Sequence, residues 1–88
     1  MNITKVIVRQ VERMNRVRAM ASVTFDDNFV IHDIRVVEGS KGLFIAMPSR
    51  RLPNGSYRDI VHPTNSETRD EIQDIILEEY EKGLQQIQ

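Results

Sequence analysis

The 88-residue chain contains no cysteine, so disulfide bonds, cysteine nucleophiles and thiolate metal sites are excluded. It also lacks any apolar run close to the roughly 20 residues of a membrane-spanning helix, because Lys5 and Arg9 interrupt its hydrophobic N-terminal stretch. We therefore expect neither a signal peptide nor a membrane anchor. These absences fit a cytoplasmic protein, and the length predicts a single domain over residues 1–88.

The net charge of −1 conceals a marked division of charge along the chain. Residues 1–62 carry ten basic and six acidic side chains, a balance of +4, whereas residues 63–88 carry two basic and seven acidic ones, a balance of −5. This asymmetry suggests either an anionic partner for the first part or attraction between the two parts. Both interpretations stay open on composition alone.

The first two thirds of the sequence is expected to form β-strands, in four segments at residues 3–11, 17–25, 29–37 and 43–47. Residues 3–11 are rich in β-branched side chains and apolar on both faces, residues 17–25 alternate cleanly, and residues 43–47 are a short apolar strand. Asp26, Asp27 and Asn28 tolerate left-handed backbone conformations, so we predict a tight hairpin between the second and third segments. Five side chains of the second segment are predicted to face the core, namely Val17, Ala19, Ala21, Val23 and Phe25.

A basic segment rich in turn-forming residues follows the fourth strand. Pro48 ends that strand because proline cannot donate a hydrogen bond to a ladder. Residues 49–61 then predict a small β-hairpin or an ordered loop around the sequence Pro-Asn-Gly at positions 53–55. We expect three apolar side chains to anchor this segment to the core: Tyr57, Ile60 and Val61.

After Pro63 the apolar period changes from two residues to 3.6, which predicts one amphipathic helix over about residues 66–86. Two capping-box spacings mark its start, at residues 64–67 and at residues 68–71. The fold class is therefore α+β, with an antiparallel sheet of four to five strands over about residues 1–62 and one C-terminal helix. Because one helix covers only one face of a sheet, we also predict a homodimer formed through sheet edges or exchanged strands.

Catalysis is not expected from the reactive side chains. His32 and His62 are the only histidines, and they lack the spacing of a metal site. No serine lies in a nucleophile elbow, and no histidine is obviously positioned to activate one. Gly39 and Gly42 lack the spacing and the following lysine of a nucleotide-binding loop, so a turn is expected there. We predict no enzyme activity, no metal and no cofactor.

The arginines around the Pro-Asn-Gly turn are the best candidates for a binding function. Arg50 and Arg51 precede the turn and Arg58 follows it, while Arg35 and Lys41 are expected nearby. Guanidinium groups bind phosphate oxygens through paired hydrogen bonds, and a rigid hairpin lowers the cost of ordering them.

The alternative is that these arginines form ion pairs with the acidic helix, for instance with Glu67, Asp70 or Glu71. Solvated or paired surface charges are the default, so composition alone favours this alternative. The acidic helix would repel nucleic acid except at its N-terminal turn, where backbone amides can meet a phosphate. That turn contains Asn65, Ser66, Thr68 and Arg69.

Two long strings then identify a family resemblance. VIHDIRVVEGSKGLFIAMPSRR at residues 30–51 and PNGSYRDIVHP at residues 53–63 resemble the SpoVG family, the stage V sporulation protein G or septation regulators. The resemblance extends from the Ile-Thr start to the Glu-Tyr end of the predicted helix. Leu52 departs from the family, whose members commonly carry a small polar residue there.

The resemblance implies a small cytoplasmic bacterial protein connected with septum formation and, in spore formers, with sporulation. Family members are described as dimeric DNA-binding regulators, with RNA binding for some. The family's paired basic residues match Arg50 and Arg51, which would act as a pair, and its helix start matches residues 65–69. The predicted nucleic-acid-binding set is Arg50, Arg51, Arg58, Lys41, Asn65, Ser66, Thr68 and Arg69. The other hypothesis is a protein-interaction module that binds a partner of the division machinery through a sheet edge or the Tyr57 region.

Overall fold

A computed structural model describes the backbone of residues 2–87 and the side chains of residues 2–11 and 15–84. The outermost residues of the predicted domain, 1 and 88, lie outside this range. The described elements are β1 (Ile3–Met14), β2 (Val17–Phe25), β3 (Phe29–Gly39), β4 (Gly42–Ala46), β5 (Ser49–Arg51), β6 (Tyr57–Asp59) and α1 (Ser66–Ile87). The predicted α+β class, an antiparallel sheet followed by one C-terminal helix, is confirmed.

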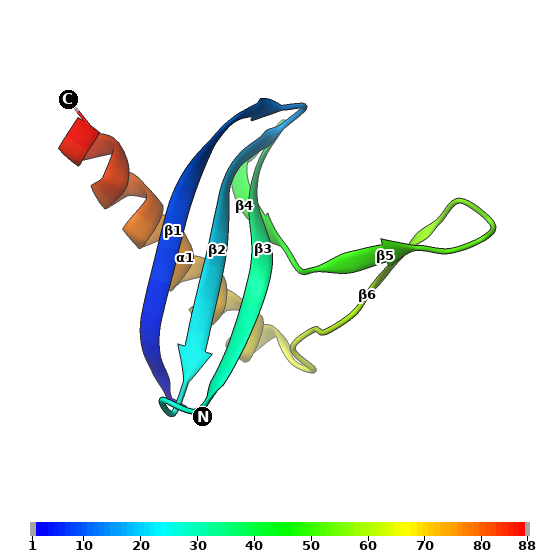
Figure 1. The fold of residues 1–88 in the computed structure, drawn as a ribbon, viewed down its shortest axis with the longest axis horizontal. Coiled ribbons are helices and arrows are strands. Elements are labelled where there is room, and N and C mark those ends of the chain that lie inside the picture. The colour runs from blue at the N-terminus through cyan, green and yellow to red at the C-terminus, as the bar shows by residue number, and fades with distance from the viewer. Residues whose placement is uncertain (1, 88) are drawn as a thin grey trace.

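Four strands form an antiparallel meander in the order β1-β2-β3-β4, and α1 lies across one face of it (Figure 1). The β2–β3 hairpin forms where it is predicted. Asp26 and Asp27 adopt positive φ angles of 52° and 57°, and Asn28 N–H donates to Phe25 O at 3.0 Å. The short polar side chains of aspartate make this left-handed geometry accessible, so the turn is encoded locally.

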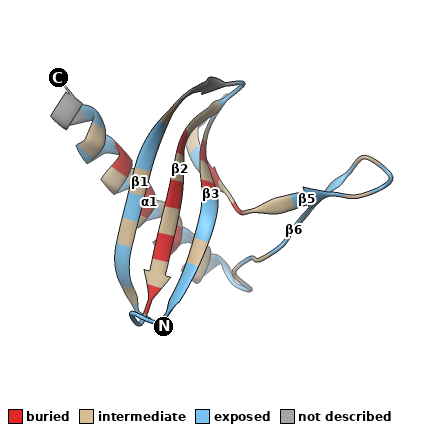
Figure 2. Ribbon diagram, in the orientation of Figure 1, coloured by how far each residue is buried: buried red, intermediate tan, exposed pale blue. Residues whose placement is uncertain are grey.

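The core lies between the sheet and the apolar stripe of α1. Ala19, Ala21, Val23 and Phe25 are buried, as the alternation in β2 predicts, whereas Val17 is only half-buried. They pack with buried residues of β3, β4 and α1, namely Ile34, Val36, Ile45, Ile72, Ile76 and Tyr80. Figure 2 shows this burial as alternating bands along β2. The apolar face of the strands, with its period of two residues, and the apolar stripe of the helix, with its period of 3.6, thus form one core.

Residues 48–62 leave the body as a separate two-stranded ribbon, which we call the arm (Figure 1). Its strands β5 and β6 pair with each other and with no other described strand. The expected anchoring by Tyr57 and Ile60 is wrong, because these side chains are 70% and 67% exposed. Only Val61 packs against the core. The arm diverges from the sheet after Pro48, so the side chains of Tyr57 and Ile60 stay exposed although their hydrophobicity would favour the interior.

Helix α1 begins with a cap that differs from both predicted capping boxes. Asn65 Oδ1 accepts a hydrogen bond from Thr68 N–H at 2.7 Å, which makes Asn65 the N-cap. The predicted capping boxes at residues 64–67 and 68–71 therefore do not form the helix N-terminus. Asparagine is among the best N-cap residues, and it stands one position before the first helical residue, Ser66.

The same helix closes the outer edge of β4 with two side chains. Gln73 Oε1 accepts from Ile45 N–H at 3.1 Å, and Arg69 Nη2 donates to Ile45 O at 2.9 Å. Both backbone groups of Ile45 would otherwise be unpaired at a partly buried edge, which is unfavourable. Along its described length α1 is too polar to cross a membrane.

Candidate nucleic-acid interface

The arm has two chemically different faces, which follow from its register. Arg50 lies directly opposite Arg58, and Arg51 lies directly opposite Tyr57. Directly opposed residues of an antiparallel pair share a face, and successive residues alternate between faces. One face of the arm therefore carries Arg50 and Arg58, while the other carries Arg51 and Tyr57.

This arrangement corrects the expectation that Arg50 and Arg51 act as a pair on one surface. Being neighbours within strand β5, they project to opposite faces, and the cross-strand partner of Arg50 is Arg58. Like charges directly opposite each other destabilise a strand pair unless an anion lies between them. The pair on one face is thus Arg50 with Arg58.

The described structure does not bear out the alternative in which the acidic helix neutralises these arginines. Among the described side chains, ion pairs form between Arg18 and Glu38 at 2.8 Å and between Lys82 and Glu78 at 3.5 Å. Arg50, Arg51 and Arg58 take part in neither, and all three are exposed. The positive charges of the arm are therefore not neutralised by ion pairs with the acidic helix in the described structure.

Hydrogen bonds at both ends hold the arm in place. At its base, Arg35 Nη2 donates to Met47 O and to Ser49 Oγ, both at 3.3 Å, and Ile60 N–H donates to Pro48 O at 2.7 Å. Such support matters because a two-stranded ribbon is at best marginally stable by itself. Arg35, which was expected near the turn, is thus attached to the root of the arm rather than to its binding faces.

At the tip of the arm, Asn54 Oδ1 accepts from both the backbone N–H and the hydroxyl of Ser56, at 3.0 Å and 2.6 Å. Gly55 has a φ of 90°, a conformation that side-chain-bearing residues rarely adopt. Leu52 N–H closes the turn by donating to Ser56 O at 2.7 Å. The tip is therefore an ordered loop, and the three arginines lie on a ribbon that hydrogen bonds stabilise at both ends.

The structure separates the remaining predicted residues from the two arm faces. Lys41 lies in the β3–β4 turn, at the far end of the five-residue strand β4, about 16 Å of extended chain from the base of the arm. Asn65 and Arg69 are engaged in the helix cap and the β4 edge described above. Ser66 is exposed, and Thr68 is half-buried beside an apolar hollow. Of the eight predicted residues, three lie on the arm, with Arg50 and Arg58 on one face and Arg51 on the other.

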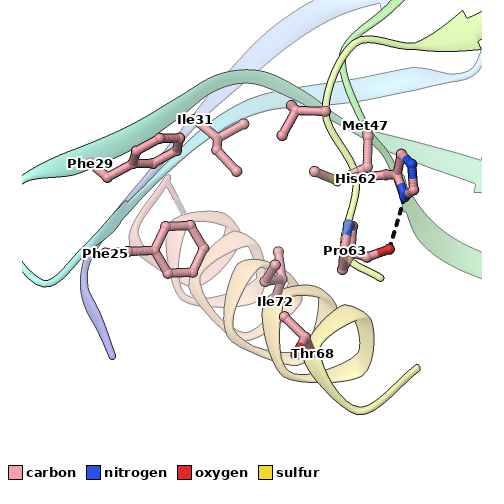
Figure 3. A pocket seen from close by; sticks show the side chains of 9 residues that line it. Phe25, Phe29, Ile31, Met47, His62, Pro63, Thr68 and Ile72 are labelled. Carbon is pink, nitrogen blue, oxygen red and sulfur yellow. Dashed lines mark hydrogen bonds between the residues drawn. The ribbon is translucent and has the colours of Figure 1, made fainter. Parts of the chain in front are cut away.

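The apolar hollow lies beneath the return of the arm, between the β2–β3 hairpin and the start of α1 (Figure 3). Its volume is about 170 Å³, and its walls include Phe25, Phe29, Met47 and Ile72. His62 stands at its rim, where Nδ1 hydrogen-bonds to Pro63 O at 3.0 Å. With the carbonyl as acceptor, Nδ1 carries the proton. His62 thus shapes the connection into the helix.

One contact between reactive side chains gives no signal in the sequence. Ser22 Oγ lies 2.9 Å from His32 Nδ1, although no histidine is obviously positioned along the chain to activate a serine. The register shift between Ala21 and Val23 in the β2–β3 pair brings these residues together on the face opposite α1. In the described part of the chain no acidic side chain hydrogen-bonds to His32, and no three potential metal ligands gather. A serine–histidine contact without an orienting group lacks the geometry of a catalytic triad.

Comparison with known proteins decides the family. The sequence model of the SpoVG family matches residues 1–82. The chain belongs to the SpoVG family. All eight predicted binding residues fall within the matched range.

Curated SpoVG proteins resemble the chain over nearly its full length. The SpoVG protein of Lachnospira eligens is 60% identical over 83 residues, covering 94% of each chain. That of Caldanaerobacter subterraneus subsp. tengcongensis is 58% identical over 83 residues, or 94% of this chain and 91% of the relative. A Clostridium perfringens relative is 56% identical over 82 residues, or 93% and 91%. The names of these relatives connect them with septation, and SpoVG is not named as an enzyme family.

Proposed function

We propose that this SpoVG protein is a non-catalytic regulator of septation and of sporulation-type gene expression that binds nucleic acid in the cytoplasm. The observation that carries this proposal is the Arg50–Arg58 pair, two exposed guanidinium groups directly opposite each other on the arm. The arm's one carboxylate, Asp59, pairs with Ser49 and so lies on the other face. A phosphate group relieves the repulsion of such a pair and accepts hydrogen bonds from both members.

We expect the double substitution Arg50→Ala/Arg58→Ala to weaken binding to labelled DNA by at least about tenfold at low salt, because charge-assisted hydrogen bonds are lost. The slope of log affinity against log salt, which is negative, should also become shallower by about 0.9 for each lost phosphate contact. Fluorescence anisotropy at several salt concentrations measures both quantities.

The matched control for charge is Lys5→Ala/Lys82→Ala, which removes two exposed positive charges away from the arm. It should change affinity much less than the arginine double substitution. Equal losses in the two variants would show that net charge alone drives binding. Unchanged affinity of a folded Arg50→Ala/Arg58→Ala protein would exclude the arm as the site.

We also propose that the protein acts as a homodimer, which would present two arms to nucleic acid. The face of the sheet opposite α1 supports this, since it carries Ile7 and Phe44 at 52% and 42% exposure. A second copy would remove this apolar surface from water. Sedimentation at micromolar concentration should show a species of twice the 10.2 kDa chain mass, and a single species at the chain mass would refute the dimer.

A second candidate function is a protein-interaction module of the division machinery. Strand β1 favours it, because this strand of 12 residues forms an edge of the described sheet and can accept a partner strand. Binding through this edge would depend little on salt. A salt-insensitive partner that still binds the Arg50→Ala/Arg58→Ala variant would support this function over the first.

A further inference from the structure

We infer that the second face of the arm is a base-stacking site, with Tyr57 as its platform, and that the arm therefore binds unpaired nucleotides in preference to duplex. This inference rests on the proposed nucleic-acid function and names its substrate class. It starts from the exposure of Tyr57, which is 70% although the residue lies within a strand. Tyr57 is the most exposed of the large hydrophobic side chains described.

The charges around Tyr57 suit a base rather than a phosphate. The register places Arg51 directly opposite Tyr57 and places Asp59 on the same face, two pairs nearer the body. This face therefore carries one positive and one negative side chain, whereas the Arg50–Arg58 face carries two positive ones. An uncharged base stacks on the face of Arg51 and Tyr57 without repulsion, and the phosphates are attracted to the face of Arg50 and Arg58.

Arg51 lies on the same face of the arm as this platform, directly opposite Tyr57. Its Nη2 lies 3.8 Å from the position that a Cβ atom on Gly55 would occupy, so the side chain extends toward the turn at the tip of the arm. A guanidinium plane is itself a stacking surface for a base, and its charge adds a cation–π contribution. Together Arg51 and Tyr57 present a planar cation and an aromatic ring side by side.

The geometry selects single strands for a simple reason. A stacking platform needs the face of a base, and a base pair inside a duplex offers only its edges in the grooves because its faces are covered by its neighbours. Unpaired bases expose both faces, and aromatic stacking accepts every base. Contacts between phosphates and the Arg50–Arg58 face would contribute equally to the binding of single strands and of duplex.

The chain permits a direct optical test. It contains no tryptophan and two tyrosines, of which Tyr80 is buried at 7% exposure. Titration with a 12-nucleotide oligothymidine strand should therefore quench the emission of Tyr57, and the quenching should vanish in Tyr57→Phe while affinity stays within about threefold. Tyr57→Leu keeps an apolar side chain but removes the ring, so it should weaken binding to the strand by about five- to a hundredfold. The same substitution should change binding to a 12-base-pair duplex by less than about twofold.

Each outcome discriminates. Wild-type affinity of Tyr57→Leu for the strand, or equal losses for strand and duplex, would overturn the stacking site. A change in the sedimentation of Tyr57→Leu with no effect on the strand would overturn it too, since Tyr57 would then contact a second copy. Loss of both ligands in Arg50→Ala/Arg58→Ala, with Tyr57→Leu unaffected, would leave the proposed function intact and remove only the stacking site. Failure of the wild-type protein to bind either ligand would refute both.

Discussion

Replacing Ile76 with alanine should lower the free energy of unfolding by about 2–5 kcal/mol, the largest effect that we expect from a single substitution. Ile76 is fully buried in the middle of α1, where it packs against the sheet. Its truncation removes apolar contacts and leaves a cavity between two rigid layers that cannot collapse completely. Urea denaturation followed by circular dichroism, at one fixed protein concentration, measures the change.

The matched control is Ile60→Ala, which deletes the same atoms from a side chain that is 67% exposed on the arm. Little surface is removed from water there, so the free energy of unfolding should change by less than about 0.5 kcal/mol. A large loss of stability at Ile60 would mean that a second copy covers the arm in solution. A small loss at Ile76 would contradict the packing of the helix on the sheet.

Arg69→Ala should lower the free energy of unfolding by about 1–3 kcal/mol because it leaves Ile45 O without its donor. The guanidinium of Arg69 also helps to hold α1 against β4, together with the hydrogen bond from Ile45 N–H to Gln73. Since Arg69 is engaged within the fold, its removal should not change DNA affinity once the folded fraction is equal. Denaturation and anisotropy on the same preparation measure the two effects.

Arg58→Ala provides the reciprocal control for Arg69→Ala. Arg58 is exposed on the arm and forms no ion pair with the described side chains, so its loss should leave stability within about 0.5 kcal/mol. It should instead weaken DNA binding. If Arg69→Ala reduced affinity as strongly as Arg58→Ala at an equal folded fraction, the helix start would belong to the binding surface after all.

Much of the body could be predicted because its information is local. The two aspartates of the β2–β3 hairpin encode their own backbone geometry, and the alternation within β2 identifies the buried face from Ala19 to Phe25. The amphipathic stripe of α1 is equally explicit, since Ile72, Ile76 and Tyr80 repeat at four-residue intervals and are all buried. These patterns work because one face of each element must leave water.

The helix start was harder to predict because several residues compete for the same role. One capping-box spacing includes position 65 and the other follows it, yet Asn65 itself accepts the hydrogen bond from Thr68 N–H. Arg69 showed no signal in the sequence for its contact with Ile45, a residue 24 positions away. Contacts at such separations depend on how the helix crosses the edge of the sheet.

The candidate site shows the same limit. The sequence indicates the three arginines but suggests Arg50 with Arg51 as the pair, because adjacency along the chain is visible in the sequence and pairing across strands is not. A two-residue turn would have specified the register, but five residues separate β5 from β6, and this length allows several registers. The exposure of Tyr57 is likewise not predictable from the sequence, since an aromatic residue in a strand is usually part of the core.

The sequence by itself determined the family, the α+β class, the body of strands with one helix, and a cluster of arginines around a turn. These features depend on residue types and on short periods along the chain. Only the tertiary structure decided that the arm leaves the sheet, that Arg50 lies opposite Arg58, and that Tyr57 lies exposed beside Arg51. The physical reason is that register and exposure depend on which distant backbone segments pair, and here the chain turns away from its own core after Pro48.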